Sequence, residues 1–286
     1  MLQLNYIRDS KDEDLKRLAI KNFKDAESII NKVIELDNNR RAKQKDGDTV
    51  KAEANAIAKQ IGELMKSGQK EEAEKQKSKT TELKQKEKQL DEELKAIEAE
   101  IQKLLVQVPN TPHLSVPLGK TPEDNAVVFE HGEKPNLPGN ALPHWELAAK
   151  YNLIDFELGV KLTGAGFPVY KGKGARLQRA LINYFLDKAT SNGYLEIQPP
   201  IMVNEDSGYG TGQLPDKEGQ MYHVTEDKYY LIPTAEVPIT NILRGELLKE
   251  SQLPIKYTGY TPCFRREAGS YGKDVRGLNR LHQFDK

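Results

Sequence analysis

The chain has 286 residues; 37% are hydrophobic, 30% are charged, and 43 basic and 43 acidic side chains leave a formal net charge of zero. This length allows two domains, and the composition is that of a soluble protein. A zero net charge excludes a global basic field, so any contact with RNA must come from local patches.

Cysteine content and apolar runs point to one compartment. The single cysteine, Cys263, excludes a disulfide within the chain and a zinc site with several cysteines, and it fits a reducing environment. The first residues are charged instead of forming the apolar core of a secretory signal. No stretch approaches the roughly 20 apolar residues that a membrane helix needs. We therefore expect a cytoplasmic protein with no membrane partner.

Residues 1–108 have the composition of long helices. No proline precedes Pro109, and good helix formers dominate. Apolar residues recur at heptad spacing in two segments, which predicts a two-stranded coiled coil. The first segment carries Val50, Ala54, Ile57, Ile61 and Leu64, and the second carries Leu83, Leu90, Leu94, Ile97, Ile101 and Leu104. Residues 66–69 between them predict a turn, so the helices should form an antiparallel hairpin.

The base of this hairpin carries more apolar residues than a narrow seam needs. We expect them to pack against a short helix over residues 12–18. They are Ile29, Ile30, Val33, Ile34 and Leu36.

A long polar hairpin has two interpretations, a dimerisation or spacer element and an arm that contacts RNA. Lysines crowd the start of the second helix, at positions 70, 75, 77, 79, 84, 86 and 88. Glutamates lie between them, so a solvated, salt-bridged face explains much of the pattern. The scarcity of aromatic residues disfavours readout of single-stranded bases, whereas contact with the backbone of a folded RNA stays open.

Residues 109–125 contain four prolines and predict a linker, because proline cannot continue a helix. The sequence therefore divides into an arm of residues 1–108, this linker, and a second domain of residues 126–286. His113 in the linker is interpreted as a packing or capping residue, since nothing near it completes a metal site.

The second domain begins with short elements. Residues 167–170 predict a strand, and residues 175–189 predict a helix with one apolar face. Residues 193–203 predict a strand whose Pro199-Pro200 pair excludes central positions of a sheet. Residues 208–224 predict a loop followed by a strand.

Residues 229–243 combine a strand, a proline and a helix start. Residues 229–232 predict the strand, Pro233 ends it, and Thr234 is placed to cap a helix that begins near Ala235. A hydroxyl and a carboxylate at a pocket wall, here Thr234 and Glu236, are also suited to hold an ammonium group and a small polar side chain.

Residues 257–286 predict two strands around a glycine-rich loop. Because side chains alternate along a strand, Arg265 and Glu267 should share one face, and Arg280, His282 and Phe284 one face of the partner. If those faces coincide, they offer a guanidinium for phosphate, a carboxylate for an exocyclic amine and a ring for a purine. The pattern predicts a nucleotide site without a glycine-rich phosphate loop.

The run FRRE followed by AGSYGKDVRGLNRLHQFDK resembles motif 2 of the class II aminoacyl-tRNA synthetases, and specifically of seryl-tRNA synthetase. The helix, strand and proline over residues 175–203 resemble motif 1, with Pro200 at its proline. TAE at 234–236 resembles the serine-binding motif, and residues 1–108 resemble the helical tRNA-binding arm. The resemblance implies an α+β fold: a long antiparallel coiled-coil hairpin, then an antiparallel sheet domain flanked by helices.

The resemblance also implies roles for residues. It assigns the α-phosphate of ATP to Arg265 as the catalytic residue, serine to Thr234, Ala235 and Glu236, and no residue to a metal. The residues implied to bind ATP are Arg265, Arg266, Glu267 and Phe284. Loop residues Lys273, Arg276 and Arg280 become candidates for phosphate or the tRNA acceptor end.

The implied reaction has two steps. The serine carboxylate attacks the α-phosphate of ATP, assisted by Mg²⁺, to give seryl-adenylate and pyrophosphate. The seryl group then passes to a ribose hydroxyl at the 3′ end of serine tRNA; the family also charges selenocysteine tRNA with serine. The helical arm embraces the long variable limb of the tRNA, and motif 1 implies a homodimer.

Motif 3 of the family does not appear before Lys286, so we expect an incomplete enzyme whose arm folds and whose catalytic half is compromised. A non-catalytic tRNA-binding or coiled-coil interaction fragment is the alternative. Related enzymes that load carrier proteins lack such an arm and are disfavoured.

Overall fold

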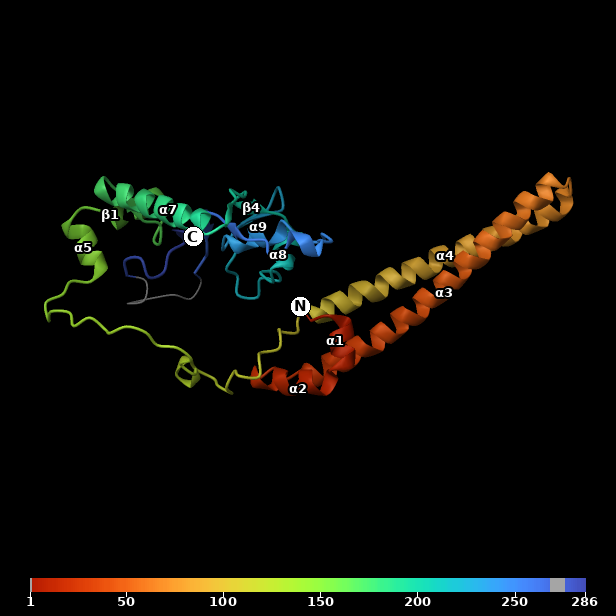
Figure 1. The fold of residues 1–286 in the computed structure, drawn as a ribbon, viewed down its shortest axis with the longest axis horizontal. Coiled ribbons are helices and arrows are strands. Elements are labelled where there is room, and N and C mark those ends of the chain that lie inside the picture. The colour runs from red at the N-terminus through yellow and green to blue at the C-terminus, as the bar shows by residue number, and fades with distance from the viewer. Residues whose placement is uncertain (1, 268–275) are drawn as a thin grey trace. The chain divides into compact units, whose positions relative to one another are not determined.

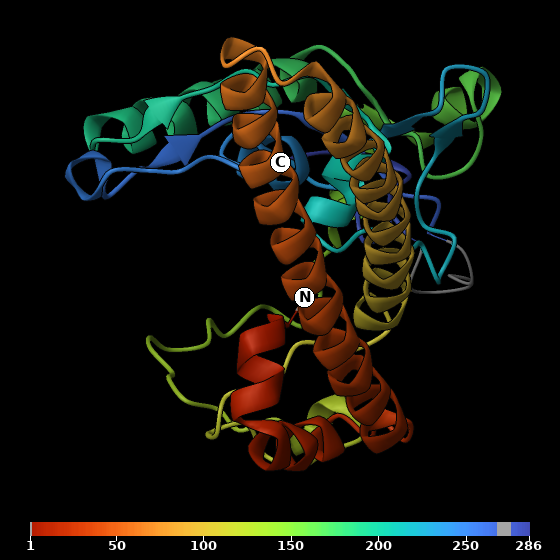
Figure 2. The same cartoon turned by 90° about the vertical axis from the view of Figure 1, so that its right-hand side faces the viewer.

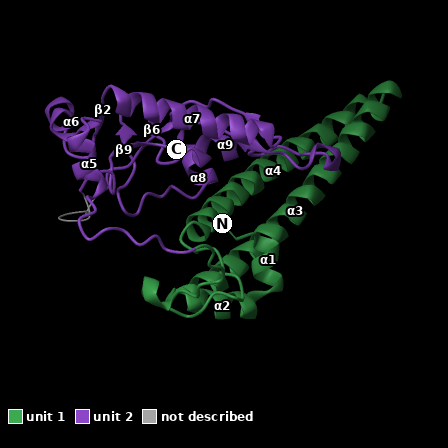
Figure 3. Cartoon of the chain, turned by 60° about the vertical axis from the view of Figure 1, so that its left-hand side comes forward, with its two compact units in different colours: residues 1–132 green, residues 133–286 purple. Residues whose placement is uncertain are grey.

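A computed structural model describes residues 2–267 and 276–286 of the chain. The chain forms two compact units, residues 1–132 and residues 133–286 (Figure 3). The first is helical apart from its last residues, and the second combines short strands with helices (Figure 1). Within the described residues, every helix is too short or too polar to span a lipid bilayer.

Two long helices, α3 (Ala26–Lys66) and α4 (Lys70–Leu105), dominate the first unit. They lie side by side as an antiparallel hairpin (Figures 1 and 2). Their seam buries Val50, Ile57, Leu83 and Leu90, with Ala54 and Ile61 packed alongside. The heptad spacing of these residues follows from the helical repeat, which keeps them on one face. The predicted hairpin is confirmed.

The turn between the two helices is closed by backbone hydrogen bonds. Gly68 has a φ of 80°, a left-handed conformation that glycine adopts without strain. The N–H of Gly68 donates to Met65 O at 3.4 Å, and that of Gln69 to Leu64 O at 3.0 Å. This is a Schellman motif, which satisfies carbonyls that the end of α3 would otherwise leave unpaired.

Two short helices, α1 (Leu4–Asp9) and α2 (Lys11–Ile20), close the base of the hairpin. The core there consists of Ile7, Leu18, Ala26, Ile30, Val33, Leu36, Ile101, Leu105 and Val108. The predicted packing of the hairpin base against a helix near residues 12–18 is confirmed. Helix α1 was not predicted from the sequence, because six residues are too few to show a helical period.

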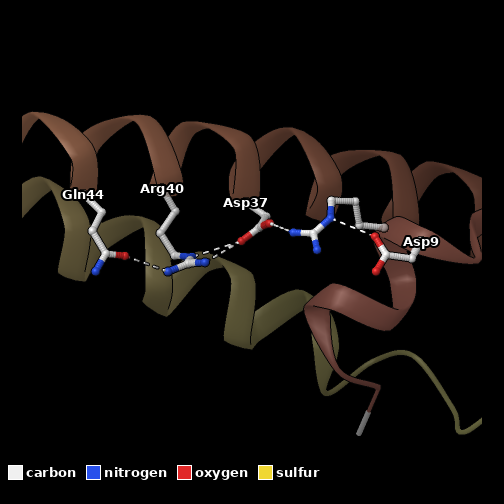
Figure 4. A network of polar contacts seen from close by, with 5 residues as sticks. Asp9, Asp37, Arg40 and Gln44 are labelled. Atoms are coloured by element: carbon white, nitrogen blue, oxygen red, sulfur yellow. Dashed lines mark hydrogen bonds and ion pairs between the residues drawn. The ribbon is translucent and has the colours of Figure 1, made fainter.

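A buried carboxylate joins α1 to α3 (Figure 4). Asp37 is 3% exposed and receives two hydrogen bonds from Arg40, from Nη2 at 2.8 Å and Nε at 3.0 Å. Arg8 of α1 approaches the other carboxylate oxygen at 3.6 Å, and its Nε donates to Asp9. Because one buried charge is shared by two guanidinium groups, α1 is held where its Ile7 enters the core.

Polar contacts also fasten the residues after α4. Arg17 of α2 donates from Nε to Pro112 O at 2.7 Å. His113 accepts a hydrogen bond from Ser115 N at 3.2 Å and so closes a local turn, as its capping interpretation predicted. A 3₁₀ turn, η1 (Pro122–Asp124), follows.

The second unit consists of short elements. They are α5 (His144–Lys150), β1 (Ile154–Asp155), α6 (Phe156–Leu162), β2 (Val169–Tyr170), α7 (Lys173–Ser191), β3 (Leu195–Glu196), β4 (Met202–Val203), α8 (Glu205–Gly210), β5 (His223–Val224), β6 (Tyr229–Leu231), α9 (Glu236–Asn241), η2 (Glu250–Gln252), β7 (Tyr257–Thr258), β8 (Pro262–Phe264) and β9 (Gln283–Asp285). The pairs β1–β2, β4–β6–β5 and β8–β9 are antiparallel, whereas β3–β7 is parallel. The predicted α+β class is confirmed.

Two predictions for this unit were wrong in detail. Residues 193–203 form two strands, β3 and β4, which belong to different sheets. Pro199-Pro200 separates them, because proline offers no N–H to a ladder. The predicted loop over residues 208–224 begins inside α8, where Asn204 caps the helix by accepting from Ser207 N at 3.0 Å. Its last two residues form the predicted strand, β5.

Candidate active site

Strands β8 and β9 form an antiparallel pair, so two strands flank the loop as the sequence predicted. The first of them was expected over residues 257–265, but residues 257–258 form β7, which pairs with β3 in a different sheet. Cys263 lies opposite Phe284, and the pairing extends to Arg265, whose N–H donates to His282 O at 2.9 Å. Residues directly opposite each other project to the same side of an antiparallel pair. Arg265, His282 and Phe284 therefore share one face, so the two predicted faces coincide at these three residues.

Arg265 makes two contacts on this face. Its guanidinium carbon lies 5.0 Å from the centroid of the Phe284 ring, within the range of a cation–π interaction. Its Nε donates to Pro233 O at 3.0 Å. Arg265 thus links β8–β9 to the segment before α9, which is 32 residues away in sequence.

Strand alternation does not carry past Arg265. The N–H of Arg266 donates to Gln220 O at 2.9 Å, and Glu267 adopts a left-handed φ of 46°. A side chain other than glycine is strained in that region, so contacts must hold it there. The Glu267 carboxylate is 13% exposed and lies 3.5 Å from Nη1 of Arg280. Glu267, expected to bind a purine amine, is thus paired with Arg280, a candidate for phosphate or the tRNA acceptor end.

His282 has a packing role on the shared face. Its Nδ1 lies 2.6 Å from the hydroxyl of Tyr222, and its ring lies 5.3 Å from the ring of Phe167. A Cβ at Gly166 would come within 2.5 Å of the imidazole, so only glycine fits there. These contacts hold the start of β9 against Gly166 and Phe167 before β2 and against Tyr222 before β5.

The segment 233–236 differs from its prediction. Helix α9 begins at Glu236 with Ala235 as its N-cap residue, so Thr234 is not the cap. The hydroxyl of Thr234 instead donates to the carboxylate of Glu236. Pro233 and Ala235 are buried, whereas the Glu236 side chain is 58% exposed. The predicted serine motif therefore presents a hydroxyl and a carboxylate while its backbone is anchored.

Lys286 completes this group, and the sequence reasoning missed it. Its Nζ donates to Thr234 Oγ1 at 2.9 Å and lies 2.7 Å from Glu236 Oε1. Burial tends to raise the pKa of Glu236, but the hydrogen bonds from Lys286 and Thr234 bring it below its ordinary value. Strand alternation was the available signal, since Lys286 lies two residues after Phe284 and so on the same face.

The remaining predicted residues lie around the loop between β8 and β9. Lys273 is outside the described residues. Arg276 is exposed, and Leu278 nearby donates from its N–H to His144 Nε2 at 2.8 Å. Among residues 2–267 and 276–286, no cluster of three or more His, Cys, Asp or Glu side chains could hold a metal ion.

Each unit contains a segment that matches the profile of a known protein domain. The profile of the seryl-tRNA synthetase N-terminal domain matches residues 1–112, and that of the class II tRNA synthetase core domain (G, H, P, S and T) matches residues 221–286. The chain is 47% identical to a serine–tRNA ligase of Salinibacter ruber and 46% identical to one of Geobacter sulfurreducens. These alignments cover all of this chain and 67% of each relative.

Solved structures agree. A seryl-tRNA synthetase of Pyrococcus horikoshii complexed with ATP aligns with a TM-score of 0.82 at 30% identity, over 100% of this chain and 68% of the other. A cytoplasmic serine–tRNA ligase of Naegleria fowleri in complex with AMP aligns with a TM-score of 0.75 at 29% identity, over 100% of this chain and 65% of the other.

Proposed function

The chain belongs to the seryl-tRNA synthetase family. We propose that its second unit converts serine and ATP to seryl-adenylate and pyrophosphate in the cytoplasm, and that its helical arm binds serine tRNA. The family's reaction needs the serine carboxylate beside the α-phosphate of ATP. No side-chain nucleophile is required, so the protein contributes positioning and charge stabilisation.

One contact carries this proposal. The hydrogen bond from Arg265 Nε to Pro233 O joins the strand pair expected to bind ATP to the segment expected to bind serine. Because Nε is engaged, the two terminal nitrogens of the guanidinium remain to meet a phosphate. A carboxylate bound at residues 234–236 would then lie near a phosphate bound at Arg265.

ATP would use the shared face of β8 and β9. We assign the adenine ring to Phe284, its amine to Glu267, and the phosphates to Arg265 and Arg266. Arg265 and Phe284 now contact each other, so the base would take the free face of the ring or displace the guanidinium. The Glu267 carboxylate is mostly covered and pairs with Arg280. In either arrangement Glu267 must therefore release Arg280 before it can accept a hydrogen bond from the adenine amine.

Serine would bind at Thr234, Ala235 and Glu236. A site that hydrogen-bonds the substrate hydroxyl can reject an analogue without it by about 10⁴-fold. Mg²⁺ would bridge phosphates of ATP and neutralise their charge. It is typically held by substrate phosphates and one or two carboxylates.

The arm would contact the tRNA backbone through its exposed lysines. Some lysines of α4 are already paired, such as Lys77 with Glu74 at 2.6 Å. Lys84 and Lys86 are exposed near them. Charge reversal at Lys84 should weaken binding of serine tRNA and reduce its salt dependence, with serine activation unchanged.

A homodimer through α7 is the third part of the proposal. The apolar face of α7 is predicted by its sequence, and the structure leaves it exposed within the described residues. Its exposed fractions are 55% for Leu177, 46% for Leu181, 61% for Tyr184 and 63% for Phe185. An apolar stripe of this kind on a soluble protein typically marks an interface. Leu181→Asp should convert a dimer to a monomer in light scattering.

The proposed activation of serine is tested by measuring serine-dependent ATP–pyrophosphate exchange catalysed by the protein. We expect exchange with serine and not with alanine, and a loss of roughly 10²- to 10³-fold in Arg265→Ala. Arg265→Lys should not restore activity, because an ammonium cannot reproduce the planar fork. Exchange that is independent of serine, or undiminished in Arg265→Ala, would overturn the proposal.

A further inference from the structure

The backbone of Lys286 is fixed by its neighbour across the strand pair. Its N–H donates to Thr261 O at 3.0 Å and its carbonyl accepts from Thr261 N at 2.9 Å. Thr261 is 1% exposed, so this double hydrogen bond lies against the core. The side chain of Lys286 therefore starts from a defined position and projects from the same face as Phe284.

The far end of the side chain meets both polar groups of the segment 234–236. The ammonium donates to the Thr234 hydroxyl and pairs with Glu236, while the Thr234 hydroxyl donates to the other oxygen of Glu236. The three groups form a closed ring of hydrogen bonds.

This ring determines what the segment can still offer a ligand. A threonine hydroxyl has one hydrogen and two lone pairs. Its hydrogen is directed to Glu236 and one lone pair is taken by Lys286, so only an acceptor position remains. Glu236, held as a carboxylate, is also an acceptor only. Without the ammonium, the hydroxyl could rotate and the carboxylate could take up a proton, and both would then present donors.

We propose that Lys286 is a positioning residue of the serine pocket, which keeps Thr234 and Glu236 as hydrogen-bond acceptors for the ammonium group of the substrate. The proposal rests on the function proposed above. The lysine charge also offsets that of Glu236, so the pocket selects by hydrogen-bond geometry more than by net charge. Lys286 and Arg265 hold the segment from two points, Arg265 at the carbonyl of Pro233 and Lys286 at the side chains beyond it.

The test compares Lys286→Met with Lys286→Arg in the full-length protein. In pyrophosphate exchange, Lys286→Met should raise the KM for serine by roughly tenfold or more, which is the fold-change of losing a charged hydrogen bond, and leave the KM for ATP nearly unchanged. Lys286→Arg should recover most of the loss. Lys161→Met removes an exposed charge from α6 and should change neither constant.

The pH dependence of serine binding distinguishes this role of Lys286 from a purely structural one, which would leave that dependence unchanged. Glu236 faces Lys286 after β9, Thr234 on its own segment and Cys263 on β8. With the ammonium gone, burial should raise the pKa of Glu236. Serine binding in Lys286→Met should then weaken at a higher pH than in the unmodified protein as the solution is acidified.

Two outcomes would overturn the inference. One is an unchanged or lower KM for serine in Lys286→Met, which would mean that the lysine charge opposes the substrate. The other is an equal rise in the KM for serine and for ATP, which would indicate general damage. Thr234→Ala separates the inference from the function on which it rests. If Thr234→Ala leaves the KM for serine unchanged, the serine pocket itself is misplaced.

Discussion

Different kinds of contact stabilise the arm and the strand pair β8–β9. In the arm, apolar residues recur at heptad spacing, so its seam is a row of similar contacts between α3 and α4. The strand pair depends on single contacts of different kinds, such as Arg265 with Pro233 and Lys286 with Thr234. A repeated pattern tolerates the loss of one member, whereas each contact of the site has one function.

The base of the arm is an exception, and we expect the largest effect there. Asp37→Ala removes a buried carboxylate and leaves Arg8 and Arg40, whose side chains are 37% and 23% exposed, without their shared partner. This should cost about 3 kcal/mol of unfolding free energy, the lower end for breaking a buried ion pair. Urea denaturation followed by circular dichroism measures it. Asp48→Ala, an exposed acid on α3, is the control and should cost less than about 0.5 kcal/mol. Equal effects would show that the network is no stronger than a surface pair.

A substitution in the seam between α3 and α4 should cost less unfolding free energy. Leu90→Ala removes a buried side chain that is 8% exposed, and we expect a loss of about 2–3 kcal/mol, near the lower end for leucine truncation because the seam is narrow. The same denaturation experiment measures it. Leu90→Met keeps most of the volume and should cost about 1 kcal/mol or less. A cost above that of Asp37→Ala would reverse the ranking of seam and base.

Two glycines of the hairpin should have opposite effects. A Cβ at Gly68 or at Gly62 would meet no atom within 4 Å, but only Gly68 has a positive φ. Gly68→Ala should therefore destabilise by about 1 kcal/mol, since alanine is strained there. Gly62→Ala lies inside α3 and should stabilise by about 0.5–1 kcal/mol. Thermal unfolding of both variants checks the sign, and a shared sign would contradict the Schellman turn.

The second unit should show a smaller, pH-dependent effect. Tyr260 donates from its hydroxyl to Asp285 at 2.9 Å, and Gln178 of α7 donates to the same carboxylate. Burial and this hydrogen bond raise the pKa of Tyr260 from 10.0 to about 12. The unfolded phenol ionises first, so its contribution to stability is complete below pH 10.0 and is lost towards about pH 12.

Tyr260→Phe is the variant that tests this window. It should destabilise by about 1 kcal/mol at neutral pH, where the hydrogen bond is intact. The difference in unfolding free energy between the two proteins should shrink as pH rises through the window. A constant difference would show that Tyr260 does not titrate as its surroundings indicate.

The sequence predicts those contacts that follow from a period visible along the chain, and it misses those that depend on single distant partners. The partners Val50, Ile57, Leu83 and Leu90 of the seam lie in helices whose period is visible in the sequence. In the strand pair, a period of two grouped His282 with Phe284, whereas only the observed register of β8 and β9 placed Arg265 on the same face. Short elements such as α1 and α8 were missed, because a helix of six residues shows no period.

By itself, the sequence determined the helical arm, the two-strand motif and the family, because periodicity and motif spacing are local properties of the chain. Only the tertiary structure showed that Thr234 pairs with Glu236 instead of capping α9, that Glu267 pairs with Arg280, and that Lys286 enters the serine segment. The physical reason is that a side-chain hydroxyl or charge takes whichever partner the fold brings within hydrogen-bond distance. For Lys286 and Thr234 that partner is 52 residues away in the chain.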